Sequence, residues 1–176
     1  MLLNVIRFVR LPLLLLLIYA VARFSIGLAG VPYAPRGNAM FSVVGVSILT
    51  GIIFGALSGR VGGFGWLGTA LIGLVIGFFG QLLIFSGTLI SYLADLNTYF
   101  VHWDALNVPE GTRAPMREAM TARASGLLFG SLTIMVFALI GRALGFLAPR
   151  PKGTIVSDNQ VISTSTGDSV PVAGTR

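Results

Sequence analysis

The chain has 176 residues, of which 55% are hydrophobic and only 10% are charged, and its mean hydropathy is +0.88. Soluble domains carry about 25% charged residues, so this composition argues against a soluble globular protein. The net charge of +6 comes from basic residues that flank apolar segments, which predicts no nucleic-acid partner. The chain has no cysteine, which excludes disulfides, thiol catalysis and thiolate metal ligands.

Four long apolar runs predict an all-α integral membrane protein, a bundle of four transmembrane helices. No acidic residue falls inside these runs. Residues 153–176, rich in Ser, Thr and Gly, predict a flexible C-terminal tail. We expect residues 1–152 to form one membrane domain, with spans over about 11–30, 39–59, 66–94 and 124–147 and an outer loop over 95–123.

The first span allows two interpretations. Pro12 suits the first turn of a helix, because the N–H that proline lacks has no partner there. Alternatively, residues 1–22 resemble a cleaved signal peptide, with Arg7 and Arg10, an apolar stretch and the small residues around Ala22. Apolar sequence resumes after Arg23, which favours a retained span, and the alternative stays open.

The third and fourth spans have features at their ends. Residues 66–94 would form a helix about 43 Å long, against a hydrocarbon core of about 30 Å. This helix must therefore tilt or project from the core. Pro115 predicts the start of a helix that runs on into the fourth span.

The basic residues at the ends of the spans predict the orientation of the chain. With the N-terminus inside, six basic residues lie inside and four lie outside, Arg23 being left out because it falls within a span. Basic residues are enriched in cytoplasmic loops. We therefore expect both termini in the cytoplasm and the chain in a bacterial inner (plasma) membrane.

Small residues recur at helical spacing in the second, third and fourth spans. A spacing of four places residues on one face of a helix. Because lipid supplies no hydrophobic force between helices, faces of small residues favour close helix packing. The predicted packing positions are Ser47, Gly51, Gly55, Gly59, Gly73, Gly77, Gly80, Gly87, Gly126, Gly130, Gly141 and Gly145. The pattern leaves open whether these faces meet within the chain or between subunits.

The stretch Gly51–Gly80 (GIIFGALSGRVGGFGWLGTALIGLVIGFFG) contains two glycine-rich spans joined by a short basic glycine turn. In this respect it resembles the small glycine-rich proteins called transglycosylase-associated. The resemblance covers only these residues, and the chain has two further spans and a long loop. It therefore implies no function for this protein.

Two polar residues within the spans are candidate functional residues. Arg23 is interpreted as an anion contact or an inter-subunit ion pair, or alternatively as the outer end of a span that starts and ends earlier. Gln81, the only amide in a span, could hydrogen-bond between helices or, with Ser86, Thr88 and Arg23, line a channel. Hydroxyls in membrane helices more often bond to their own i−4 carbonyls. Arg142 is expected to extend to the inner membrane surface.

The start of the outer loop is the densest polar and aromatic segment. It contains His102, the only histidine, together with Asp95 and Asp104. A metal site needs three or four ligands and a bis-histidine haem needs two histidines. We therefore predict no metal site and no catalytic residue, expect lipids rather than a cofactor, and interpret the loop aromatics as an interfacial belt. Haem or pigment binding through His102 is the alternative.

The functional hypotheses follow from what these segments contain. Since no carboxylate lies within a span, a proton- or cation-coupled transporter is disfavoured. The leading hypothesis is a non-catalytic small subunit of a larger membrane complex, or a homo-oligomer, that docks through the glycine-lined helix faces and the outer loop. A self-contained oligomeric channel or transporter is the alternative, and a membrane enzyme using His102 is the third.

Overall fold

The computed structural model describes residues 1–31 and 42–147, which form helices and turns without a strand. Within these residues the helices are α1 (Leu2–Leu28), α2 (Val43–Arg60), α3 (Trp66–Leu93), α4 (Trp103–Leu106) and α5 (Met116–Leu147). Four of them, α1, α2, α3 and α5, are long and apolar enough to cross a membrane. The prediction of an all-helical chain with four such helices is confirmed. The predicted tail and the first residues of the predicted second span lie outside the described residues.

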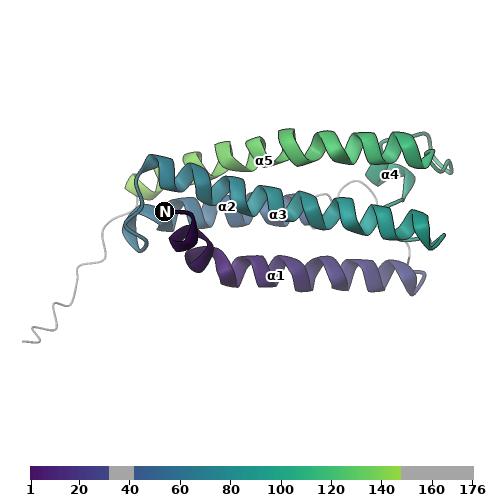
Figure 1. The fold of residues 1–176 in the computed structure, drawn as a ribbon, viewed down its shortest axis with the longest axis horizontal. Coiled ribbons are helices and arrows are strands. Elements are labelled where there is room, and N and C mark those ends of the chain that lie inside the picture. Colours follow the sequence, from purple (N-terminus) through teal and green to yellow (C-terminus); the bar gives the residue numbers. More distant parts are fainter. Residues whose placement is uncertain (32–41, 148–176) are drawn as a thin grey trace, which may run out of the picture.

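The four long helices form an elongated bundle in which α3 contacts the other three (Figure 1). Helices α1 and α5 lie on opposite sides of α2 and α3. The start of α1, the turn between α2 and α3 (residues 61–65) and the last turns of α5 share one end of the bundle, called here the turn end. The loop between α3 and α5 (residues 94–115) and α4 form the other end, the loop end.

Helix α1 begins at Leu2, nine residues before the expected start of the first span, and Pro12 is inside the helix. The prediction that Pro12 occupies the first turn is therefore wrong. Packing explains the difference, because Val5 and Val9 are fully buried and belong to the core. Their burial stabilises the helical turns that precede Pro12, although this proline lacks the N–H for one backbone hydrogen bond. The first turns of α1 lie at an angle to the rest, as proline-containing helices often bend (Figure 1).

The other helix boundaries lie close to the expected ones. Helix α3 covers Trp66–Leu93, and α5 begins at Met116, directly after Pro115, where Ala119 N–H donates to the Pro115 carbonyl oxygen at 3.0 Å. The predicted outer loop is consequently shorter than expected, because its last eight residues belong to α5. At 28 and 32 residues, α3 and α5 are about 42 and 48 Å long.

The hydrophobic core has two parts. Val5, Val9 and Leu16 of α1 pack with isoleucines of α3 and α5, and a second cluster at the loop end contains Ala20 and Phe100. Residues 1–22, which also allow interpretation as a signal peptide, thus supply buried side chains to both parts. Removing them would expose the surfaces of α2 and α3 that they cover.

The predicted packing positions lie against other parts of the same chain. A Cβ added at Gly73 of α3 would fall 2.6 Å from the Met135 Cα of α5, and one added at Gly141 of α5 would fall 2.8 Å from the Ile52 Cα of α2. Real Cβ atoms do not approach so closely, so these backbones leave no room for a side chain. Added Cβ atoms would also meet another element at Gly51, Gly55, Gly59, Gly77, Gly80, Gly87, Gly126, Gly130 and Gly145.

Candidate functional site

The loop end contains a polar and aromatic cavity of about 610 Å³. Its walls come from the end of α1, including Gly27, and from the α3–α5 loop, including Asp95, Tyr99, His102 and Arg113. Cavities of about 300–1,000 Å³ are the usual size for small-ligand sites. The sequence cluster that predicted an interfacial belt therefore lines a hollow.

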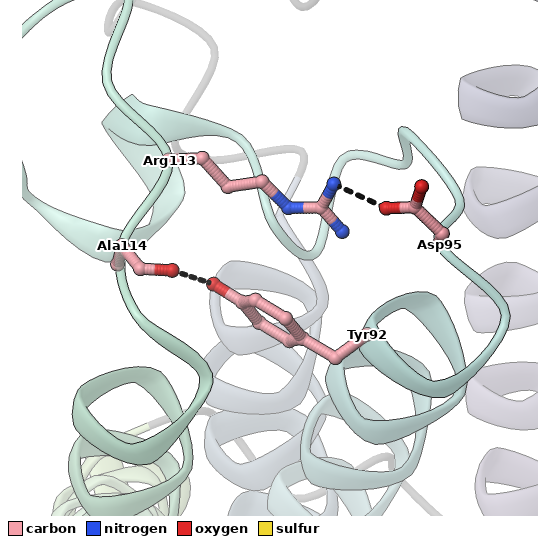
Figure 2. A network of polar contacts seen from close by, with 4 residues as sticks. All are labelled: Tyr92, Asp95, Arg113 and Ala114. Atoms are coloured by element: carbon pink, nitrogen blue, oxygen red, sulfur yellow. Dashed lines mark hydrogen bonds and ion pairs between the residues drawn. The ribbon is translucent and has the colours of Figure 1, made fainter.

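Three contacts hold the two ends of the loop together beside this cavity, and Figure 2 shows the ion pair and the hydrogen bond among them. The Arg113 Nη1 atom forms an ion pair with Asp95 Oδ1 at 2.7 Å, and its guanidinium lies 5.1 Å from the centroid of the Tyr92 ring. The Tyr92 hydroxyl donates to the Ala114 carbonyl oxygen at 2.6 Å. The Asp95 side chain is 88% exposed, so the ion pair itself contributes little stability. The contacts order the loop by joining its two ends.

His102 is the N-cap residue of α4 and directly precedes its first residue, Trp103. Its Nδ1 accepts a hydrogen bond from the Asp104 N–H at 3.3 Å, and its ring centroid lies 5.1 Å from that of Trp103. Desolvation lowers the pKa of His102 from its ordinary value, and the nearby Asp104 carboxylate opposes this shift. The neutral imidazole is the form that can accept this bond. The geometry thus gives His102 a role in shaping the loop.

Arg123 of α5 connects four elements at the loop end. Its Nε donates to Thr88 Oγ1 of α3 at 3.2 Å, and its Nη2 donates to the carbonyl oxygens of Phe100 and Ala105 at 3.1 and 3.2 Å. We call this group the loop-end clamp. From the sequence, Arg123 is only one of the four basic residues expected at the outer membrane face. Its position about two turns inside α5 from Met116 was the signal that could have marked it as a tertiary contact.

Arg142 of α5 makes a matching group at the turn end. Its Nη1 donates to the Phe64 carbonyl oxygen at 2.5 Å, to Thr69 Oγ1 at 3.0 Å and to Ser58 Oγ at 3.3 Å. The Ser58 and Thr69 hydroxyl oxygens are themselves 2.6 Å apart, and the guanidinium lies 5.0 Å from the Trp66 ring centroid. We call this group the turn-end clamp. Instead of extending freely to a surface, Arg142 ties α5 to α2, to α3 and to the turn between them.

The two polar residues predicted within the spans lie apart. Arg23 is inside α1, with its Cζ 5.0 Å from the centroid of the Tyr99 ring, so it does not mark the end of that helix. Gln81 is buried in α3, and its side chain occupies the space left by Gly126 and Gly130 of α5. The two glycines thus accommodate an amide at the α3–α5 contact.

Two buried hydroxyl groups of α3, those of Thr88 and Ser91, form hydrogen bonds within the chain. Thr88 Oγ1 donates to the Ile84 carbonyl oxygen at 2.8 Å, and Ser91 Oγ donates to that of Gly87 at 2.6 Å. Both residues are fully buried. The expectation that such hydroxyls bond to their own i−4 carbonyls is confirmed for these two residues.

The remaining chemical hypotheses concern His102 with Asp95 and Asp104. Among residues 1–31 and 42–147, no group of three or more His, Cys, Asp and Glu side chains is placed to hold a metal ion. Asp95 pairs with Arg113, while Asp104 offers His102 its backbone N–H. The described contacts of these side chains are structural.

Comparison with known proteins adds no functional assignment. No protein family matches the chain, and neither a curated protein nor a solved structure does.

Proposed function

We propose that this protein is an integral membrane protein that serves as a non-catalytic small subunit of a larger membrane complex. In this proposal α1, α2, α3 and α5 span the bilayer, the turn end faces the cytoplasm together with both termini, and the loop end faces outward. Arg123 and Arg142 are 19 residues apart in α5, or about 28 Å, close to the thickness of a hydrocarbon core of about 30 Å. Each clamp would then lie near one edge of the hydrophobic layer.

A groove on the side of the bundle carries the docking part of the proposal. It has a volume of about 650 Å³ and runs between α1 and α5 over the surface of α3. Its lining is apolar except for Ser131, and comprises Ile6, Leu13, Leu74, Val75, Phe78, Phe79, Ala124, Leu127, Leu128, Ser131 and Leu132. A transmembrane helix of a partner would fill such a groove by packing side chains into it.

The glycine-lined faces have a different role in this proposal. Their positions lie against other parts of the same chain, so we infer that they stabilise this bundle and that docking relies on the groove and the outer loop. The polar groups described above are likewise engaged within the chain. The outer loop supplies an ordered aqueous surface next to its cavity, and the groove supplies the contact within the bilayer.

A crosslinking experiment tests docking directly. Phe78 lines the groove and is 52% exposed, whereas Phe129 of α5 is 67% exposed and is not a lining residue of the groove. We expect a photoreactive phenylalanine at position 78 to crosslink in cells to one discrete polypeptide, and the same residue at position 129 to react with lipid. The mass of the adduct distinguishes a different subunit from a second copy of this chain.

Two outcomes would contradict the proposal. One is that position 78 reacts only with lipid, as position 129 does. The other is that the protein purified in mild detergent runs as a monomer without a second chain. Either result would remove the groove as a docking site.

A further inference from the structure

The charged residues are divided unequally between the two ends of the bundle. Every acidic residue within 1–31 and 42–147 lies at the loop end, in the α3–α5 loop, in α4 or in the first turn of α5. These residues are Asp95, Asp104, Glu110 and Glu118. The turn end has arginines and, in the part of the chain that the structure describes, no carboxylate. A surface with charges of one sign attracts partners of the opposite sign.

Two of the arginines at the turn end belong to the first turns of α1. Arg7 and Arg10 are three residues apart, so they lie on the same side of the helix, and both are exposed. Their guanidinium groups form neither a hydrogen bond nor an ion pair with any described residue. Between them, the Phe8 ring packs edge to face on Phe64 with the ring centroids 5.3 Å apart, which places this part of α1 beside the turn.

Arg142 adds a third charge at this end. Its hydrogen bonds within the described residues go to two hydroxyls and one carbonyl oxygen, which hold the guanidinium without a compensating negative charge. The guanidinium also lies 5.0 and 5.7 Å from the ring centroids of Trp66 and Phe146. These rings are 53% and 67% exposed. Exposed tryptophan in a membrane protein is typical of the headgroup level, so the aromatic pair indicates the depth of this charge.

Exposed apolar side chains accompany the arginines of α1. Leu2, Leu3 and Ile6 are all exposed, and the turns that contain them lie at an angle to the rest of α1 (Figure 1). Helical segments that combine arginine with exposed apolar residues bind at the boundary between headgroups and acyl chains. The start of α1 therefore suits a lipid surface better than an acidic protein, which would leave these apolar side chains in water.

We propose that the turn end binds the headgroups of anionic phospholipids through Arg7 and Arg10, with Arg142 adding to the attraction. Guanidinium groups bind phosphate through charge-assisted hydrogen bonds, and basic residues next to a transmembrane helix enrich anionic lipid around it. A zwitterionic headgroup has the same phosphate but no net charge, so it gains less from this surface. This inference rests on the proposed insertion of the bundle into a bilayer and not on docking in the groove.

The two tryptophans of the chain allow a local measurement, because Trp66 is at the turn end and Trp103 is at the loop end. Trp103→Phe leaves Trp66 as the only tryptophan, and Trp66→Phe leaves Trp103. Each full-length variant is reconstituted into vesicles of phosphatidylglycerol and phosphatidylcholine in equal amounts, with bromine on the acyl chains of one lipid at a time. Since bromine quenches tryptophan on contact, the ratio of the two quenching measurements gives the local lipid composition.

We expect phosphatidylglycerol to be enriched about fivefold over phosphatidylcholine around Trp66. Trp103 should show no such preference. In the protein with Trp66 alone, Arg7→Gln together with Arg10→Gln should remove most of the enrichment. Both side chains are exposed and glutamine is a good helix former, so this variant should fold. Arg113→Gln together with Arg117→Gln removes the same charge from the loop end and should leave the enrichment unchanged.

Salt provides an independent check on the cause of the enrichment. Raising the ionic strength from about 0.1 M to about 1 M shortens the screening length from about 10 Å to about 3 Å, so the preference at Trp66 should fall. The proposal is overturned if Trp66 is quenched equally by both lipids, if the Arg7 and Arg10 variant keeps the enrichment, or if the Arg113 and Arg117 variant loses as much of it. Absence of quenching of Trp66 by either lipid would overturn the insertion of the bundle and this inference together.

Discussion

The two clamps on α5 have the same plan and different surroundings. In each, an arginine of α5 donates to a threonine of α3 and to loop or turn carbonyl oxygens, and 19 residues separate both the two arginines and the two threonines. Arg142 packs beside Ser58 and the Trp66 ring, whereas Arg123 borders a cavity shared with a second arginine. The same residue type thus fills the contact between helices at one end and lines a cavity at the other.

This difference indicates which clamp is structural. Around Arg142 the donors and acceptors are satisfied by one another, apart from its buried Nε, which has no hydrogen-bond partner within the described residues. Beside Arg123 lies a cavity of about 190 Å³, which has room for water. Mutations at the turn end should therefore cost more stability than equivalent mutations at the loop end.

The largest expected effect comes from replacing the arginines. Arg142→Met keeps much of the side-chain volume but leaves Ser58, Thr69 and the Phe64 carbonyl short of a charged donor. We expect a loss of about 2–4 kcal/mol of unfolding free energy. Arg123→Met should lose about 1–2 kcal/mol, because water in the adjacent cavity can replace the donor. Reversible unfolding in mild detergent measures both, and equal losses would contradict the comparison.

The next effect concerns the α3–α5 contact. A methyl group at Gly73 meets the backbone of α5 at Met135, which cannot yield without moving the helix. We expect Gly73→Ala to destabilise the protein by about 1–3 kcal/mol. At Gly130 the three atoms nearest to the added methyl group all belong to the Gln81 side chain, which can rotate. Gly130→Ala should be close to neutral, since alanine also favours the helix by about 1 kcal/mol. If Gly130→Ala lowered the free energy of unfolding more than Gly73→Ala, this account of the α3–α5 contact would be contradicted.

A smaller effect is expected from the threonines. Thr69→Val preserves shape but removes a hydroxyl that bonds to Arg142 and Ser58, so we expect a loss of about 1–3 kcal/mol. In Thr88→Val, Arg123 keeps its two carbonyl acceptors, and the loss should stay below about 1 kcal/mol. Unfolding of the two variants under one set of conditions gives the comparison, and it fails if Thr88→Val costs as much as Thr69→Val.

The smallest effect is the pH dependence of the loop end. Because the pKa of His102 is lowered in the folded protein, the folded state binds fewer protons than the unfolded state as pH falls below the ordinary value of 6.5. The contribution of His102 to the free energy of unfolding is therefore fully present above pH 6.5. It is lost as the pH falls towards the pKa of His102 in the folded protein. The single histidine allows NMR titration of its ring without assignment. A measured pKa at or above 6.5 would contradict this account, and His102→Gln should remove the dependence.

The sequence predicted the long helices well and their tertiary contacts poorly. Apolar runs indicated all four long helices, and Pro115 indicated the start of α5. The start of α1 was missed because local proline preference was outweighed by burial of Val5 and Val9. Such burial depends on residues of other helices, which a single helical pattern does not contain.

The clamps and cavities were beyond prediction for a related reason. Arg142 bonds to Phe64 and Arg123 bonds to Phe100, partners that are 78 and 23 residues away in the chain. Arg23 was recognised as a possible anion contact, but its convergence with Arg123 requires the packing of α1 and α5 around the other helices. Composition located the polar loop, and only the fold showed that it covers a hollow.

The most direct test of the central claim is the sidedness of the two ends of the bundle in the membrane. Because the chain has no cysteine, Val61→Cys at the turn end and Glu110→Cys at the loop end can each be labelled at a single site, and both positions are exposed. We predict that a membrane-impermeant maleimide labels Cys at position 110 in intact cells and labels position 61 only after permeabilisation. Labelling of both positions from the same side would contradict a bundle that spans the membrane with one clamp near each face.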